Sequence, residues 1–79
     1  MIFTDGIHLI SDQSIDELHR FAQGMGLKRH WFQNKRGRPR PHYDLTTENA
    51  VNRAVKKGAV KISQTDLVRK LIDTYEVNP

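Results

Sequence analysis

Side chains that can bind an anion, stack on a base or transfer a proton are concentrated in one stretch of the chain, residues 27–46. This stretch holds the single Trp, two of the four His and six of the thirteen Lys and Arg residues. No acidic residue occurs in residues 28–40, whereas the rest of the chain has seven basic side chains against nine acidic ones. The net charge of +4 is therefore local, and it predicts an anionic partner at this stretch.

The candidate ligand-binding residues in this stretch combine three kinds of chemistry. Basic side chains such as Arg29 supply positive charge for a phosphate or carboxylate. Trp31 and Tyr43 offer ring faces on which a base can stack, each contact being worth about 1–3 kcal/mol. His42 and Asp44 can hydrogen-bond a ribose or a base edge, or act as an acid–base pair. The full predicted set is Lys28, Arg29, His30, Trp31, Arg36, Arg38, Arg40, His42, Tyr43 and Asp44.

Purely structural roles remain open for some of these residues. Trp31 and Phe32 also suit a hydrophobic core, and Tyr43 with Asp44 also suits the cap and apolar staple of a following helix. The sequence does not decide whether these aromatic rings face a cleft or the core.

A second interpretation is a metal-dependent phosphodiesterase or nuclease. Asp5, His42 and Asp44 carry side chains that coordinate divalent ions, and the His-x-Asp spacing places two ligands on one side of a strand end. His30 is a further candidate ligand. However, Asp5 precedes Gly6, and this pair also predicts a tight turn or a loop. No HExxH, Walker, CxxC or GxSxG motif is present, so no cofactor is expected other than a divalent metal under this interpretation.

Two short motifs within the basic stretch mimic DNA-binding elements. Residues 31–36 match the WFQNxR core of a homeodomain recognition helix, but Gly37, Pro39 and Pro41 would stop such a helix at once. Residues 36–39 match the Arg-Gly-Arg-Pro core of an AT-hook, which enters narrow A·T minor grooves. Four residues of a basic loop match easily by chance, so a general phosphate-contacting loop is the favoured interpretation.

The elements that position these residues are predicted to form one α/β domain over residues 1–79, in the order β-α-β-α-β-α with a short three-stranded sheet. The predicted strands lie in residues 2–11, 27–33 and 59–62, and the predicted helices span residues 14–25, follow a cap at Thr46 or Thr47, and follow a cap at Ser63. Ser14 and Glu17 match a capping box. His8 is expected to be a solvated strand residue. Residues 34–41 are predicted to be a basic Gly/Pro loop within the domain.

Composition limits the class of protein. A chain of 79 residues buries a limited fraction of its surface, so a homo-oligomer is an open expectation. It has no cysteine, which excludes disulfides and thiolate metal sites and fits a reducing compartment. No apolar run reaches the roughly 18 residues of a membrane span. A small cytoplasmic protein with no membrane partner is expected.

Several blocks of the sequence resemble the domain-of-unknown-function 4031 family, small proteins common in bacteria and their phages. The most specific are GLKRHWFQ (residues 26–33) and PHYDLT (residues 41–46), and the similarity extends from the opening IFTDG to the final DLVRKL. The connection between the two blocks is shorter and less basic in the family, so residues 34–40 are where this chain departs. The resemblance implies no reaction. It implies one site formed by Lys28, Arg29, Trp31, His42, Tyr43 and Asp44, in a protein of the bacterial host cytoplasm.

The leading hypothesis is therefore non-enzymatic binding of a phosphate-bearing ligand, either nucleic acid or a nucleotide. The two blocks that flank the basic loop would define the site, and the loop would tune it. The family context suggests a phage protein that acts on a host nucleotide signal or on DNA. Metal-dependent phosphodiester cleavage and a protein–protein adaptor that uses the basic loop are the alternatives.

Overall fold

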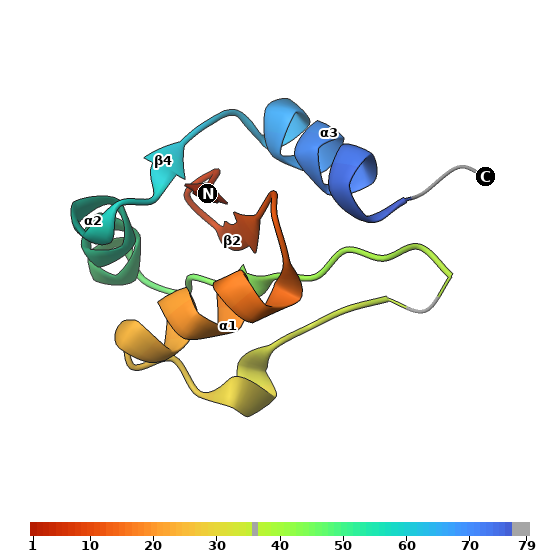
Figure 1. Ribbon diagram of the computed structural model, residues 1–79. Helices are drawn as coiled ribbons and strands as arrows, with labels where there is room; N and C mark the ends of the chain where they lie inside the picture. Colours follow the sequence, from red (N-terminus) through yellow and green to blue (C-terminus); the bar gives the residue numbers. More distant parts are fainter. Residues whose placement is uncertain (36, 77–79) are drawn as a thin grey trace.

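The centre of the fold is a four-stranded mixed sheet in the order β3-β2-β1-β4. β1 (Ile2–Thr4) and β2 (His8–Ser11) form an antiparallel hairpin, β3 (Tyr43–Asp44) pairs antiparallel with β2, and β4 (Val60–Lys61) runs parallel to β1. The computed structural model describes residues 1–35 and 37–76 (Figure 1). Gly6 closes the hairpin with a φ of +97°, a conformation that favours glycine.

Three helices surround this sheet (Figure 1). They are α1 (Ile15–Gly24), α2 (Glu48–Lys57) and α3 (Gln64–Tyr75), and a short 3-10 turn, η1 (Arg29–Trp31), follows α1. The side-chain hydroxyls of Ser14, Thr47 and Ser63 each accept a hydrogen bond from a backbone N–H in the first turn of α1, α2 and α3. Within the described ranges, no helix has the length and apolar character needed to cross a lipid bilayer.

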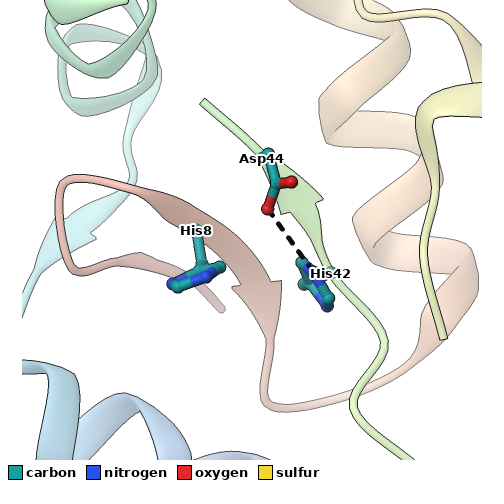
Figure 2. Close-up of side chains that lie close together, drawn as sticks. All are labelled: His8, His42 and Asp44. Carbon is teal, nitrogen blue, oxygen red and sulfur yellow. Dashed lines mark ion pairs between the residues drawn. The ribbon is translucent and has the colours of Figure 1, made fainter. Parts of the chain in front are cut away.

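Alternating side chains place the two faces of the sheet in separate cores. Ile2 and Leu9 pack with buried residues of α1 and α2, whereas Phe3 and Ile10 pack with buried residues of α3. The domain is therefore three layers deep, with α1 and α2 on one face of the sheet and α3 on the other. The same alternation along β2 and β3 separates Leu9 and Tyr43 from His8, His42 and Asp44, which are drawn in Figure 2.

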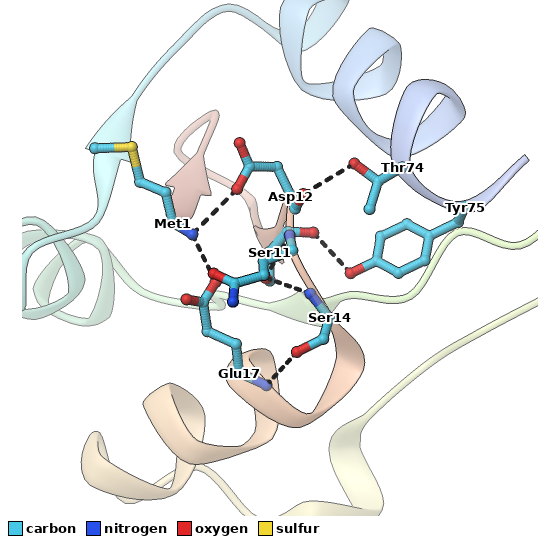
Figure 3. Close-up of polar contacts among 8 residues, drawn as sticks. Met1, Ser11, Asp12, Ser14, Glu17, Thr74 and Tyr75 are labelled. Atoms are coloured by element: carbon cyan, nitrogen blue, oxygen red, sulfur yellow. Dashed lines mark hydrogen bonds and ion pairs between the residues drawn. The ribbon is translucent and has the colours of Figure 1, made fainter.

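The C-terminal turn of α3 is fixed to the connection between β2 and α1 (Figure 3). The phenol of Tyr75 donates a hydrogen bond to the carbonyl oxygen of Ser11 at 2.7 Å, and the hydroxyl of Thr74 donates one to the carbonyl oxygen of Asp12 at 3.3 Å. Burial raises the pKa of the Tyr75 phenol, which keeps it protonated as a donor. These two bonds hold α3 in place over its face of the sheet.

The predicted capping box at α1 is confirmed in one of its two halves. The hydroxyl of Ser14 accepts a hydrogen bond from the backbone N–H of Glu17, as expected. The carboxylate of Glu17 does not turn back to the cap. It accepts a hydrogen bond from the hydroxyl of Ser11 at 2.6 Å and lies 2.7 Å from the ammonium group of Met1 (Figure 3). The Met1 ammonium and the Ser11 hydroxyl together lower the pKa of Glu17.

The α/β prediction is confirmed, but the sheet differs from the one expected. The prediction of a strand in residues 27–33 was wrong, because η1 lies there. The strand that pairs with β2 on its outer side is β3. Leu27 and Phe32 explain the difference. Both pack against the core between the sheet and α1 and α2, although residues five apart on a strand would point to opposite faces. A turn between them lets both side chains reach the same core. The sheet has four strands because residues 2–11 form two of them, β1 and β2, instead of one.

Replacing Tyr75 by Phe is expected to lower the free energy of unfolding by about 0.5–1.5 kcal/mol, because the ring stays while the hydrogen bond to Ser11 is lost. Urea unfolding followed by circular dichroism measures the change. Asp73→Asn, on the exposed side of the same turn, is the control and should stay within about 0.5 kcal/mol of the parent. Equal stability of Tyr75→Phe and the parent would show that the bond does not anchor α3.

Candidate functional site

The pairing of β3 with β2 gathers three potential metal ligands on one face of the sheet. Leu9 lies opposite Tyr43 in the register, and both are buried in the core that faces α1 and α2. His8 lies opposite Asp44, and His42 is two residues before Asp44, so alternation sends these three side chains to the other face (Figure 2). One ligand atom from each of the three lies within 4.8 Å of the other two.

Hydrogen bonds fix the orientation of the His42 ring. Its Nδ1 lies 2.6 Å from the carbonyl oxygen of Arg40, and because a carbonyl can only accept, Nδ1 carries the proton. Nε2 is therefore the ring nitrogen that remains for another partner. This atom lies 3.4 Å from Oδ1 of Asp44 (Figure 2). The rings of His42 and His8 meet edge to face, with centroids 5.3 Å apart.

The carboxylate of Asp5 orients the ring of His8 by contacting its Nδ1 atom. The Asp5 side chain is only 2% exposed, and Oδ2 lies 2.9 Å from Nδ1 of His8. Oδ1 accepts the backbone N–H groups of Ile7 and His8 at 2.9 and 2.7 Å. Burial by itself would raise the pKa of the Asp5 carboxyl, but the hydrogen bonds from His8 and the two amides hold that pKa below its usual value of 3.8. The carboxylate is therefore ionised and accepts a hydrogen bond from Nδ1–H of His8, which leaves Nε2 as the ring nitrogen available to another partner.

Gln33 holds the third member of the group and closes the basic loop. Its side-chain amide donates a hydrogen bond to Oδ2 of Asp44 at 2.7 Å, so Oδ1 is the oxygen that faces His42. The backbone N–H of Gln33 donates to the carbonyl oxygen of His42, and the N–H of His42 donates in return, both at 2.9 Å. Residues 34–41 are thus a loop that leaves and re-enters the sheet edge at one point.

A cleft of about 320 Å³ separates this loop from α3. Its lining residues are Asp5, His8, Gln33, Asn34, Lys35, Arg40, His42, Gln64, Leu67, Val68 and Leu71. Arg40 fixes the outer end of the loop, because its guanidinium lies 3.2 Å from the carboxylate of Glu76 just after α3. Its backbone N–H also donates to the side-chain oxygen of Asn34 at 2.9 Å, across the loop. The loop and α3 form the two walls of the cleft, and His8 and His42 line it where the loop joins the sheet.

The predicted ligand-binding residues do not form one site. Arg40 and His42 line the cleft, and Asp44 lies beside them. His30 and Trp31 line a second pocket of about 420 Å³ that also includes Gln33 and Asp44. Lys28 and Arg38 are exposed and line neither pocket, Arg29 lies near His19 and Tyr43, and Arg36 lies outside the described residues.

The prediction that Tyr43 stacks on a ligand was wrong. Its side chain is 1% exposed, and it is one of the largest fully buried residues of the domain. Its hydroxyl lies 2.6 Å from Nδ1 of His19, and its ring packs 5.6 Å from that of Phe32. Trp31, in contrast, is 45% exposed, so it remains available as a stacking surface, whereas Phe32 packs against the core.

His8 and Gln33 are members of the site that sequence reasoning missed. His8 was expected to be a solvated strand residue, and Gln33 was assigned to a strand without a role. One signal in the sequence points to His8. In HLIS the apolar Leu9 alternates with His8 just as Tyr43 alternates with His42 and Asp44 in HYD. The pairing of the two segments, however, is visible only in the folded chain.

The fold and the cleft define a small α/β domain with a His-His-Asp group where the edge strand β3 meets β2. The family model described as protein of unknown function (DUF4031) matches residues 5–74, a range that contains all three members of this group. The chain therefore belongs to that family, which confirms the resemblance seen in the sequence. No curated protein and no solved structure matches the chain.

His19 contacts the Tyr43 hydroxyl of β3 on the core side of the sheet, and its pKa shift indicates how the free energy of unfolding depends on pH. Burial lowers the pKa of its imidazole below the ordinary value of about 6.5, the charge of Arg29 lowers it further, and Asp16 partly opposes the change. The unfolded chain consequently takes up a proton at higher pH than the folded protein does. The contribution of His19 to stability is therefore complete above about pH 6.5 and declines as the pH falls through the folded-state pKa.

His19→Gln should remove this decline. In urea unfolding between about pH 5 and 8, the parent protein is expected to lose stability towards the acidic end, and His19→Gln is expected to lose less. His30→Gln, which changes an exposed histidine on η1, is the matched control and should keep the slope of the parent. An unchanged slope in His19→Gln would refute the role of this residue.

Proposed function

We propose that the protein binds a nucleotide, or another small phosphate-bearing ligand, in the cleft between the loop of residues 34–41 and α3. The observation that supports this proposal is the contrast between the two walls of the cleft. Basic and amide side chains come from the loop, whereas α3 contributes three aliphatic side chains and the amide of Gln64. A nucleotide has the same division, with a charged phosphate at one end and an apolar base face at the other.

The loop wall offers donors for phosphate oxygens. Lys35 is exposed and lines the cleft, where its ammonium group is a mobile positive charge. Arg40 uses one guanidinium nitrogen for Glu76 and for the carbonyl oxygen of Pro39, and its other N–H groups are left for a ligand. The side-chain amide of Asn34 lines the same wall. Such groups bind phosphate through charge-assisted hydrogen bonds.

The wall formed by α3 offers an apolar surface. Val68 is 37% exposed and lines the cleft, while Leu67 and Leu71 behind it are buried against Phe3 and Ile10. An exposed aliphatic patch beside basic groups suits the face of a base or a ribose. The cleft volume of about 320 Å³ falls at the small end of the roughly 300–1,000 Å³ that ligand pockets occupy. These dimensions favour one nucleotide over a long nucleic acid.

Lys35→Ala is expected to weaken binding of nucleoside mono- and diphosphates by about 10–100-fold, because one charge-assisted contact worth about 1.5–3 kcal/mol is lost. Isothermal titration calorimetry with a nucleotide panel and inorganic phosphate measures the change. Lys56→Ala is the matched control, since Lys56 is exposed on α2 and lines a different pocket with Arg53. Equal affinity of Lys35→Ala and the parent for every nucleotide would contradict the proposal.

Val68→Asp tests the other wall. A carboxylate at this position should repel the phosphate and remove the apolar contact, so nucleotide affinity is expected to fall at least about 10-fold. Ile72→Asp introduces the same charge at an equally exposed position of α3 that does not line the cleft, and it should have a smaller effect.

The nucleotides should be recovered unchanged after incubation, because the proposed function is binding. Cleavage that requires a divalent metal would favour the phosphodiesterase interpretation instead.

A further inference from the structure

Ligand atoms of His8, His42 and Asp44 lie within 4.8 Å of one another beside the cleft. Nδ1 is engaged in both histidine rings, so Nε2 is the ring nitrogen available to a metal ion. The carboxylate of Asp44 presents Oδ1 to Nε2 of His42 at 3.4 Å. A metal ion between these atoms would satisfy all three side chains, whereas a proton on Nε2 of His42 would satisfy only the contact with Asp44. We propose that His8, His42 and Asp44 bind one divalent transition-metal ion.

The groups behind these three residues distinguish a metal site from a chance cluster. Metal-binding histidines almost always donate their second ring N–H to a carboxylate or a backbone carbonyl, and ligating carboxylates are themselves hydrogen-bonded. Here the buried carboxylate of Asp5 holds His8, the carbonyl oxygen of Arg40 holds His42, and the amide of Gln33 holds Asp44. Each proposed ligand is thus oriented by a separate partner. That pattern requires contributions from the hairpin turn, the basic loop and the residue before it.

The donor set indicates which ion fits. Two imidazoles and one carboxylate suit zinc and the neighbouring first-row ions better than magnesium or calcium, which prefer oxygen. At ligand bonds of about 2.0–2.1 Å, two ligands of a tetrahedral zinc ion lie about 3.3 Å apart. The 3.4 Å between His42 and Asp44 already matches this value. The ligand atom of His8 lies within 4.8 Å of the other two and would have to come closer by about 1.5 Å or less to complete the triangle.

An ion held by three protein ligands retains an open position, and catalytic zinc sites use such a position for water or substrate. His8 and His42 line the cleft, so the open position faces the space proposed above for the ligand. A phosphate oxygen is the natural fourth ligand there. Binding of the ion itself does not depend on the nucleotide proposal. The ligand set also differs from the one predicted from sequence, because Asp5 supports His8 and does not bind the ion.

Titration of tag-free, metal-stripped protein with Zn²⁺ by calorimetry, and with Co²⁺ by visible absorption, tests the site. One ion per chain is expected, with cobalt bands typical of a low coordination number. His42→Ala and Asp44→Ala should each weaken the binding of both ions by at least about 10-fold. His30→Ala is the matched control and should leave affinity unchanged, since His30 is an exposed histidine outside the group.

Asp5→Asn is a more specific test, because it should weaken the support of the His8 ring while the hairpin turn still folds. The asparagine side-chain oxygen can still accept hydrogen bonds from the two turn amides. The substitution removes the negative charge that holds the proton of His8 on Nδ1. Loss of a supporting partner of this kind typically costs 10–100-fold in metal affinity. Circular dichroism verifies that each variant is folded. No binding of either ion to the parent, or equal weakening by Asp5→Asn and His30→Ala, would overturn the proposal, whether or not nucleotides bind.

Discussion

β3 is two residues long, and it is held against β2 in a register that places Leu9 opposite Tyr43 and His8 opposite Asp44. The buried phenol ring of Tyr43 fixes this register, because a shift by one residue would expose the ring and bury its charged neighbours. The pairing is stabilised further by the hydrogen bond between Tyr43 and His19 on the core side. Every polar group of the site takes its direction from this one short strand pair.

The polar groups on the opposite face form an ordered arrangement around this pair. Asp5 shows most clearly how hydrogen bonds offset the free-energy cost of burying a charged group. A carboxylate that is 2% exposed is unfavourable unless it is fully hydrogen-bonded, and here two backbone amides and an imidazole satisfy it. The hairpin turn that the Asp-Gly pair makes possible therefore also orients His8. Turn formation and site geometry depend on the same side chain.

The basic loop contributes to the site through its anchored end more than through its exposed charges. Arg40 is tied to Glu76 at the end of α3, and its carbonyl oxygen orients His42. Tyr75 and Thr74 hold the same end of α3 on the connection between β2 and α1. The C-terminal end of α3, one wall of the cleft, is consequently fixed both to the loop and to the connection after β2. Lys35 and Arg38 extend from this frame as exposed charges.

Local physical chemistry in the sequence determined the α/β class, the helix caps at Ser14 and Ser63 and the position of the positive charge along the chain. These features depend on residues close together in the chain, so patterns of caps, apolar spacing and composition predict them. The His-x-Asp alternation of residues 42–44 was also readable, because it follows from the two-residue period of a strand.

The tertiary structure alone decided which residues meet across the sheet. It placed His8 beside Asp44, sent Tyr43 into the core, set Asp5 behind His8 and turned residues 27–33 into η1 and its flanks. Strand partners and buried faces are chosen by packing between segments far apart in sequence. No local pattern in IFTDG or HYDLT specifies that pairing. The ligand-binding chemistry could therefore be read from single residues, while the site that they form could not.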